Sequence, residues 1–235
     1  MSNLNILSGG AAQGLVGSLA PAFKARTGLD IAGEFGAVGV MADKLRKGTP
    51  ADIVILTAAL LAKLAREKLV VAASIADVGL VETTLAVRAG DPQAVAKDAA
   101  GLREVLLASD AIFVPDTQAS TAGIHVANVL QQLGIADEVA ARLRIFPNGA
   151  TAMRELAASK ARRPIGCTQS TEIISTKGVT LSGSLPAGCE LATMYTAGIA
   201  IAAAHPQQAE HLIELLIGVD QHEQRTRAGF LGGPN

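Results

Sequence analysis

Short apolar runs alternate along the chain with segments in which apolar residues recur every three to four positions. The run "LDIAGEF" (29–35) precedes a helix-like segment at 38–48, and "ADIVIL" (51–56) precedes "AALLAKLAREKL" (58–69). The first member of each pair has the length and composition of a buried strand, and the second has the period of a helix. This alternation predicts an α/β protein in which helices cover a largely parallel sheet.

The same alternation continues in a second block that begins near residue 83. We expect strand-like or helix-opening segments at 83–92, 111–116, Ser120–Thr121, Asn148–Gly149 and 163–168. A long run at 192–204 then leads into a helix at 205–218, where Pro206 is tolerated in the first turn. The second block therefore predicts another α/β unit, and we find no internal repeat.

A glycine-rich turn stands where the first strand should meet the first helix. In "NILSGGAAQGLVGSLAPAF" (5–23) the strand breaks at Ser8–Gly10 and helical spacing follows. Glycine permits a tight turn. A turn without side chains also lets an anion reach the unpartnered N–H groups of a helix start. Both explanations stay open on this stretch alone, and Pro21 should kink the helix.

Composition and charge exclude several classes of partner. The chain has 235 residues, of which 49% are hydrophobic, so it can bury a substantial core. With 20 basic and 21 acidic residues, it has no electrostatic footprint for nucleic acid or an anionic membrane. No apolar run reaches the roughly 20 residues of a membrane span, and no signal peptide is visible. As written the chain is expected to be cytoplasmic, although an exported protein without its signal would look the same.

Three stretches in order resemble the type II periplasmic binding proteins, specifically their molybdate-binding branch. They are residues 6–56, 129–160 and 195–218, which contain the specific phrase G-x-P-A-D-[IV] at Gly48–Ile53. The resemblance implies two α/β lobes joined by two crossover strands, with a ligand cleft between them. It also implies one lobe made of 1–83 with 196–235, and a second lobe made of 84–195.

The resemblance implies that ligand-binding loops lie at three helix starts. The corresponding residues are Gly9, Gly10 and Ala11, then Ala37 and Val38, and in the second lobe Ser120 and Thr121. Molybdate binders of this family use serine hydroxyls at the first two loops, and this chain has none at the matching positions. Their ligand-contacting tyrosine falls near Thr168. The resemblance implies a small anionic ligand, and the missing serine hydroxyls favour an organic di- or tricarboxylate over molybdate.

Polar residues crowd the end of the strand at 163–168. They are Thr168, Gln169, Ser170, Thr171 and Glu172. One interpretation is a helix start, in which Ser170 or Thr171 is the cap and Glu172 favours the positive end. The other makes Gln169 and Thr171 ligand donors and Glu172 a base. Both interpretations stay open.

Several single residues each have two interpretations. His125 is a structural group or a second proton carrier. Tyr195, the only tyrosine, packs at the hinge or contacts ligand. Cys167 is a packing residue or a thiol with a lowered pKa, and with Cys189 it could form a disulfide. No metal or cofactor motif is visible. The basic residues Arg154, Lys160, Arg162 and Arg163 indicate a solvated helix end rather than a binding patch.

Two functions remain open from the sequence. The first is a solute receptor, which would deliver its ligand to an ABC transporter if it is exported. The second is a cofactor-independent isomerase, because the chain also resembles aconitate isomerase in its general pattern. Such an enzyme needs a base beside the substrate, for which Glu172 and His125 are the candidates.

Overall fold

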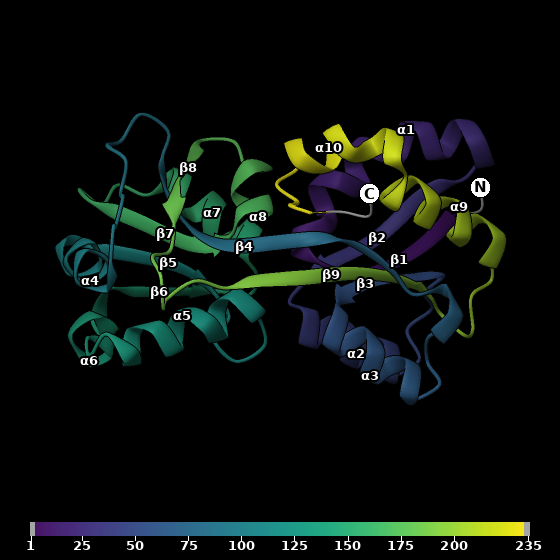
Figure 1. Cartoon of the computed structure of the whole chain (residues 1–235), viewed down its shortest axis with the longest axis horizontal. Coiled ribbons are helices and arrows are strands. Elements are labelled where there is room, and N and C mark those ends of the chain that lie inside the picture. Colours follow the sequence, from purple (N-terminus) through teal and green to yellow (C-terminus); the bar gives the residue numbers. More distant parts are fainter. Residues whose placement is uncertain (1–2, 233–235) are drawn as a thin grey trace. The chain divides into compact units, whose positions relative to one another are not determined.

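A computed structural model describes residues 3–232 of the chain, which fold into two compact units. Unit 1 ends at Val81 and resumes at Thr193, and unit 2 is Glu82–Ala192. The chain therefore crosses between units inside two strands, β4 (Ala76–Arg88) and β9 (Ala192–Ile199) (Figure 1). The sequence-based expectation placed these crossings near residues 83 and 195.

Unit 1 is built on four strands in the order β2-β1-β3-β9. The central strand β1 runs parallel to both neighbours, and β9 runs antiparallel to β3. The other strands are β1 (Asn3–Gly9), β2 (Asp30–Gly36) and β3 (Ile53–Thr57). The helices are η1 (Gly10–Ala12), α1 (Gln13–Thr27), α2 (Val38–Arg46), α3 (Ala58–Arg66), η2 (Ala72–Ser74), α9 (Pro206–Ile217), η4 (Val219–Gln221) and α10 (His222–Arg227).

Helices cover both faces of the unit 1 sheet, so its strands are buried on both sides. Helices α1, α9 and α10 lie on one face, and α2 and α3 lie on the other (Figure 1). Leu15, Leu19 and Phe23 of α1 are fully buried in this core. The helix continues through Pro21, whose side chain is exposed, and ends at Gly28 with a φ of 76°. A left-handed residue at this position is the usual reason for a helix to stop at glycine.

Unit 2 repeats this architecture with the strand order β4-β7-β5-β6, and β8 pairs with β4. Strand β5 runs parallel to β6 and β7, whereas β4 runs antiparallel to β7 and to β8. These strands are β5 (Ala111–Pro115), β6 (Leu143–Phe146), β7 (Pro164–Gln169) and β8 (Val179–Ser184). The helices are α4 (Ala99–Ala108), α5 (Thr121–Gln132), α6 (Ala136–Val139), η3 (Ala140–Arg142), α7 (Gly149–Ala158) and α8 (Ser170–Ile174).

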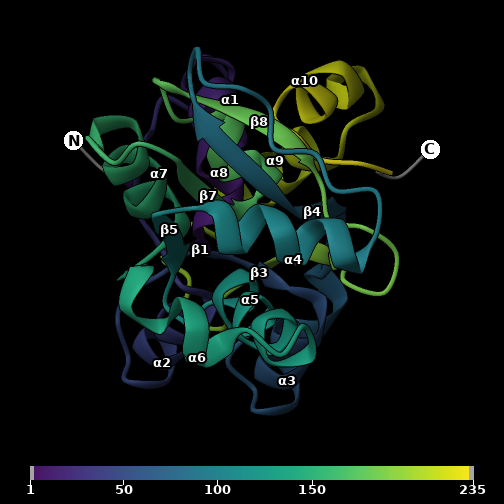
Figure 2. The ribbon, with the colours of Figure 1, turned by 90° about the vertical axis from the view of Figure 1, so that its left-hand side faces the viewer.

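Alternate residues of the unit 2 strands enter two different cores. Leu85 of β4 packs in a cluster with α4 and α5, whereas its neighbour Ala86 packs in a second cluster with α7 and α8. Successive side chains of a strand point to opposite faces, which explains the division. Accordingly α5 and α7 lie on opposite sides of β5 (Figure 2). Within residues 3–232, no helix has the length and apolarity to cross a bilayer.

Candidate functional site

The glycine-rich loop of unit 1 lies beside the loop that opens α2. Because β1 and β2 run parallel and in register, Gly9 stands opposite Gly36, so both strands end at the same edge of the sheet. Gly10 and Ala11 then form the buried start of η1. Ala37 is the N-cap of α2 and Val38 is its first residue. The sequence-predicted loops of this unit are therefore brought together.

Gly9 is required at its position by close packing. A Cβ atom there would lie 2.8 Å from Cγ1 of Val38 and 2.9 Å from Cε1 of Tyr195. Tyr195 belongs to unit 1, on β9 opposite Thr57, and is only 2% exposed. The structure therefore gives a steric reason for the glycine at position 9, and it places the single tyrosine beside Gly9.

None of these loop helices has a capping side chain. The N-caps of η1 and α2 in unit 1, and of α5 and α8 in unit 2, make no side-chain hydrogen bond to the helix start. By contrast, Asp98 caps α4 and Asn148 caps α7 with hydrogen bonds of 2.8 Å. The first N–H groups of a helix need partners from outside it. Four helix starts with predicted ligand residues thus have no capping side chain.

The interpretation of residues 170–171 as caps of α8 is wrong. The N-cap is Gln169, and Ser170 is already the first helical residue. The sequence misled because Ser and Thr are the commonest capping residues, whereas here β7 continues to Gln169 and leads directly into the helix. Ser170, Thr171 and Gln169 are all buried in unit 2.

Glu172 is buried and tied to the start of α7. The Thr168 hydroxyl donates to its Oε2 over 2.6 Å, and the N–H groups of Ala150, Gly149 and Gln169 also hydrogen-bond to the carboxylate. A Cβ atom on Gly149 would lie 1.8 Å from Oε2, so only glycine fits there. Burial raises the pKa of Glu172 from 4.5, and it outweighs these donors, which lower the pKa.

Three buried threonine hydroxyls in unit 2 have no hydrogen-bond partner among the described residues. They belong to Thr83, Thr84 and Thr171, each at most 3% exposed. The antiparallel register places Thr83 opposite Gln169 and Thr84 opposite Thr168. The sequence analysis singled out Thr171 but missed the other two, for which the signal was the pair "TT" where the second block begins. Buried hydroxyls normally have a partner, so these three mark candidate ligand donors. As neighbours on β4, Thr83 and Thr84 face opposite sides of the sheet.

Ser120 and Thr121 open α5 as the sequence predicted, and His125 follows one turn later. The Nε2 atom of His125 donates to the carbonyl oxygen of Cys189 over 2.8 Å. This contact attaches α5 to the loop around residue 189, which supports a structural role for His125. Thr121 and His125 are partly exposed, unlike the residues at the end of β7.

Neither cysteine forms a disulfide, and burial raises the pKa of both thiols. Cys167 and Cys189 are buried free thiols, so the disulfide alternative is wrong. Burial raises the pKa of Cys167 to about 12. The alternative of a lowered pKa is therefore also wrong, because the side chain points into the apolar core beside α4 and α5 instead of toward a helix start.

Two α/β units of this topology, each with helix starts at the ends of parallel strands, define a type II periplasmic-binding-protein fold. The chain belongs to the family described as bacterial extracellular solute-binding protein, which matches residues 4–231. The family match confirms the resemblance noted from the sequence.

Two proteins of known structure share this fold, and one known enzyme is distantly similar in sequence. The periplasmic molybdate-binding protein of Azotobacter vinelandii has a TM-score of 0.82 at 19% identity, covering 99% of this chain and 100% of that one. The sulfate-binding protein SubI of Mycobacterium tuberculosis has a TM-score of 0.75 at 18% identity, covering 98% and 86%. An aconitate isomerase from a Pseudomonas species is 24% identical over 231 residues, which is 94% of this chain and 84% of that protein.

Proposed function

We propose that the protein binds a small organic di- or tricarboxylate, to which both of its units contribute donors. The observation that carries this proposal is that the buried hydroxyls of Thr83, Thr84 and Thr171 have no hydrogen-bond partner among the described residues. A buried hydroxyl without a partner costs roughly 1–3 kcal/mol, which a ligand carboxylate would recover. Unit 1 would supply N–H groups from Gly9–Ala11 and Ala37–Val38.

The loops of unit 1 favour a carboxylate over a compact oxyanion. They offer backbone donors but no hydroxyl that could reach into a ligand, since Ser8 donates its own hydroxyl to the carbonyl of Gly9 over 2.8 Å. A tetrahedral oxyanion needs many donors around one centre. A di- or tricarboxylate distributes its charge over separate groups, each of which can use one helix start.

Calorimetric titration tests this proposal directly. We expect citrate, tricarballylate or malate to bind, and molybdate and sulfate to bind at least tenfold more weakly. Thr171→Val keeps the shape of the side chain but removes the hydroxyl, so it should weaken binding about tenfold. Thr180→Val is the matched control, because Thr180 is exposed on β8 in the same unit. Tight molybdate binding without a carboxylate signal would contradict the proposal.

We infer that a membrane transporter of the ABC class receives the ligand if the protein is exported. The family description as extracellular supports export. Expression of the full gene followed by fractionation of periplasm and cytoplasm tests this point. Recovery of the protein from the cytoplasm alone would favour the second candidate function.

The second candidate is isomerisation of an unsaturated tricarboxylate, and the aconitate isomerase relative favours it. A base would remove a proton from the carbon beside the double bond, the double bond would shift, and the proton would return at the far allylic carbon. Glu172 and His125 are the proposed proton carriers. Both already hydrogen-bond to the protein, so as a base either residue would have to exchange these partners for substrate.

Incubation with trans-aconitate in deuterium oxide tests the isomerase. A new isomer carrying deuterium is the expected product if the fold is catalytic. Glu172→Gln should then slow turnover by at least about 10²-fold, whereas Glu155→Gln, an exposed change on α7, should not. His125→Asn reports on the other candidate. Carboxylate binding with neither isomer nor deuterium exchange would leave the receptor function alone.

A further inference from the structure

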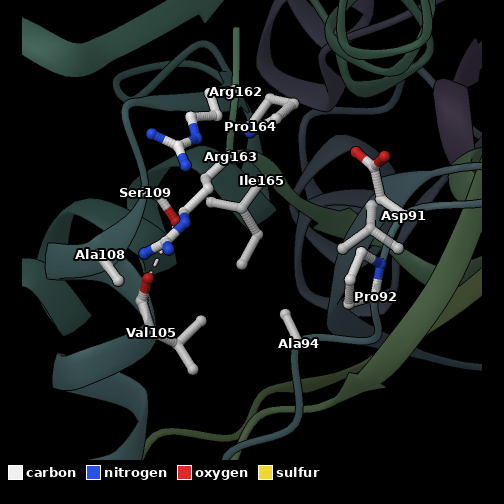
Figure 3. A pocket seen from close by; sticks show the side chains of 11 residues that line it. Asp91, Pro92, Ala94, Val105, Ala108, Ser109, Arg162, Arg163, Pro164 and Ile165 are labelled. Carbon is white, nitrogen blue, oxygen red and sulfur yellow. Dashed lines mark hydrogen bonds between the residues drawn. The ribbon is translucent and has the colours of Figure 1, made fainter.

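Unit 2 contains a cavity of about 270 Å³. It lies at the edge of the sheet where β7 begins, whereas Thr168 lies near the edge where β7 ends. The cavity lies between the last turn of α4, the start of β7 and the loop that follows β4 (Figure 3). Pro164 at its edge and Gln169 at the proposed carboxylate site stand at the two ends of β7. At a rise of about 3.3 Å per residue, they are roughly 16 Å apart.

The cavity has an apolar floor and a cationic wall. Val105, Ile165 and Ala94 direct their side chains around the hollow, and Arg162 and Arg163 extend toward α4 at one side (Figure 3). Both arginines are exposed. Among residues 3–232, neither guanidinium forms an ion pair with a carboxylate.

The acidic side chains near this cavity already accept hydrogen bonds from other residues of the chain. Asp110 accepts the backbone N–H groups of Arg162 and Arg163 over 2.8 and 2.9 Å, which fixes the main chain of both arginines. Asp91, on the opposite side of the cavity, accepts from Nε of Arg88 over 2.7 Å. The two guanidinium groups therefore remain available to an anion from outside the chain.

The walls are held in place without a ligand. The N–H of Ala94 donates to the hydroxyl of Ser182, and that hydroxyl also lies 3.0 Å from the carbonyl of Ala94. Arg88, at the end of β4, donates to the carbonyl of Ser159, which follows α7, over 2.7 Å. A cavity that already has its shape loses little free energy to ordering when a ligand binds.

We propose that this cavity is a second binding site, for an amphipathic anion with one anionic head and a short apolar tail. The head would contact Arg162 and Arg163, and the tail would lie against Val105 and Ile165. The volume is near the lower end for ligand sites, so it suits a molecule such as a six-carbon carboxylate. The sequence analysis read these arginines as a solvated helix end. The apolar cavity beside them is what changes that interpretation.

Titration of the full chain with hexanoate, followed by amide NMR, tests the second site. We expect saturable shifts around residues 91–94, 105–109 and 162–165. Acetate lacks the tail and hexanol lacks the charge, so each should bind at least about tenfold more weakly. Arg163→Gln should also cost about tenfold, since a hydrogen bond to a charged group is lost, whereas Arg154→Gln removes the same charge from α7 and should change nothing.

Two further observations would decide against this site. Ala108→Phe fills the cavity from an exposed position on α4 and should abolish the shifts while the rest of the spectrum stays folded. Unchanged hexanoate binding in that variant would overturn the proposal, as would equal affinity for hexanol. Shifts confined to residues 8–11 and 168–171 would place hexanoate at the proposed carboxylate site instead, which separates this proposal from the first.

Discussion

At the residue scale, Gly9 shows how a small side chain determines the shape of the unit 1 loops. Its backbone angles, φ −59° and ψ 145°, suit any residue, so substitution there causes no backbone strain. Gly9→Ala should nevertheless lower the free energy of unfolding by about 1–3 kcal/mol, because the new methyl group would displace Val38 and Tyr195. Chemical denaturation measures the loss, and carboxylate affinity should fall with it.

Gly17 provides the matched control for this prediction. It lies on the exposed side of α1, and a Cβ atom there would meet nothing within 4 Å. Gly17→Ala should therefore raise the free energy of unfolding by up to about 1 kcal/mol through helix propensity. Equal effects of the two substitutions would show that Gly9 is not held by close packing.

Glu172 should make stability depend on pH. Its pKa in the folded protein is raised from 4.5 because burial disfavours the charged form. The protonated form is thus favoured by folding, so this contribution is fully present below pH 4.5 and is lost as the pH rises through the folded value. Urea titrations from pH 4 to 8 should show this decline, with a slope of at most about 1.4 kcal/mol per pH unit.

Glu172→Gln should flatten that decline, since an amide does not titrate. The exposed residue Glu155 on the adjacent α7 is the control, and Glu155→Gln should leave the slope unchanged. If the Glu172→Gln protein retains the full slope, another group is responsible. In that case the pKa of Glu172 would be the same in the folded and the unfolded protein.

At the scale of elements, the starts of α4 and α7 have equivalent caps but different surroundings. Asp98 accepts the N–H of Gly101, and Asn148 accepts that of Thr151, each over 2.8 Å. Changing either residue to alanine should cost about 1 kcal/mol, measured by thermal or chemical unfolding. Only Asn148→Ala should also alter the pH dependence that arises from Glu172, because Glu172 binds the neighbouring N–H groups of α7. A change in that dependence with Asp98→Ala would contradict this reasoning.

The sequence predicted elements whose pattern is local and missed those that depend on pairing. The strand at 51–56 and the helix that follows it stand out from their own residues. Strand β4 begins at Ala76, seven residues before the expected start, because pairing and burial continue through Gly79, which has a φ of 153°. Strand β8 has no strong apolar signal, since it is only partly buried against β4.

Only the loops of the candidate site that match a known family could be predicted from the sequence. The three loops at Gly9, Ala37 and Ser120 were expected from the family resemblance. The link between Glu172 and Gly149 was not expected, because 23 positions separate them and only the fold brings α8 to the start of α7. Thr83 and Thr84 were missed for a similar reason. Their burial without a partner depends on the register of β4 against β7, which no single segment contains.

At the scale of the whole molecule, each unit has its own hydrophobic core. One cluster belongs to unit 1, and two belong to unit 2. Arg225 in unit 1 is 2% exposed and donates from Nη1 to the carbonyls of Leu216 and Gly218 over 3.1 and 2.6 Å, at the end of α9. Arg225→Ala should cost roughly 2–3 kcal/mol by leaving these carbonyls unpaired. In calorimetry, only the unfolding temperature of unit 1 should fall. An equal fall in the unfolding temperatures of both units would show that their cores are not independent.

A ligand that binds both units should make them unfold in a single transition. Units with separate cores can unfold at different temperatures, and a carboxylate that needs donors from both units stabilises only the state in which both are folded. At a ligand concentration of 100 times Kd, the gain is about 2.7 kcal/mol. We therefore expect citrate to raise the lower transition of the wild-type protein and to bring the two transitions together. In the Thr171→Val protein the same concentration should shift them less. Stabilisation of unit 2 alone would mean that the ligand contacts only residues of unit 2, and the loops at Gly9 and Ala37 would then have no part in binding.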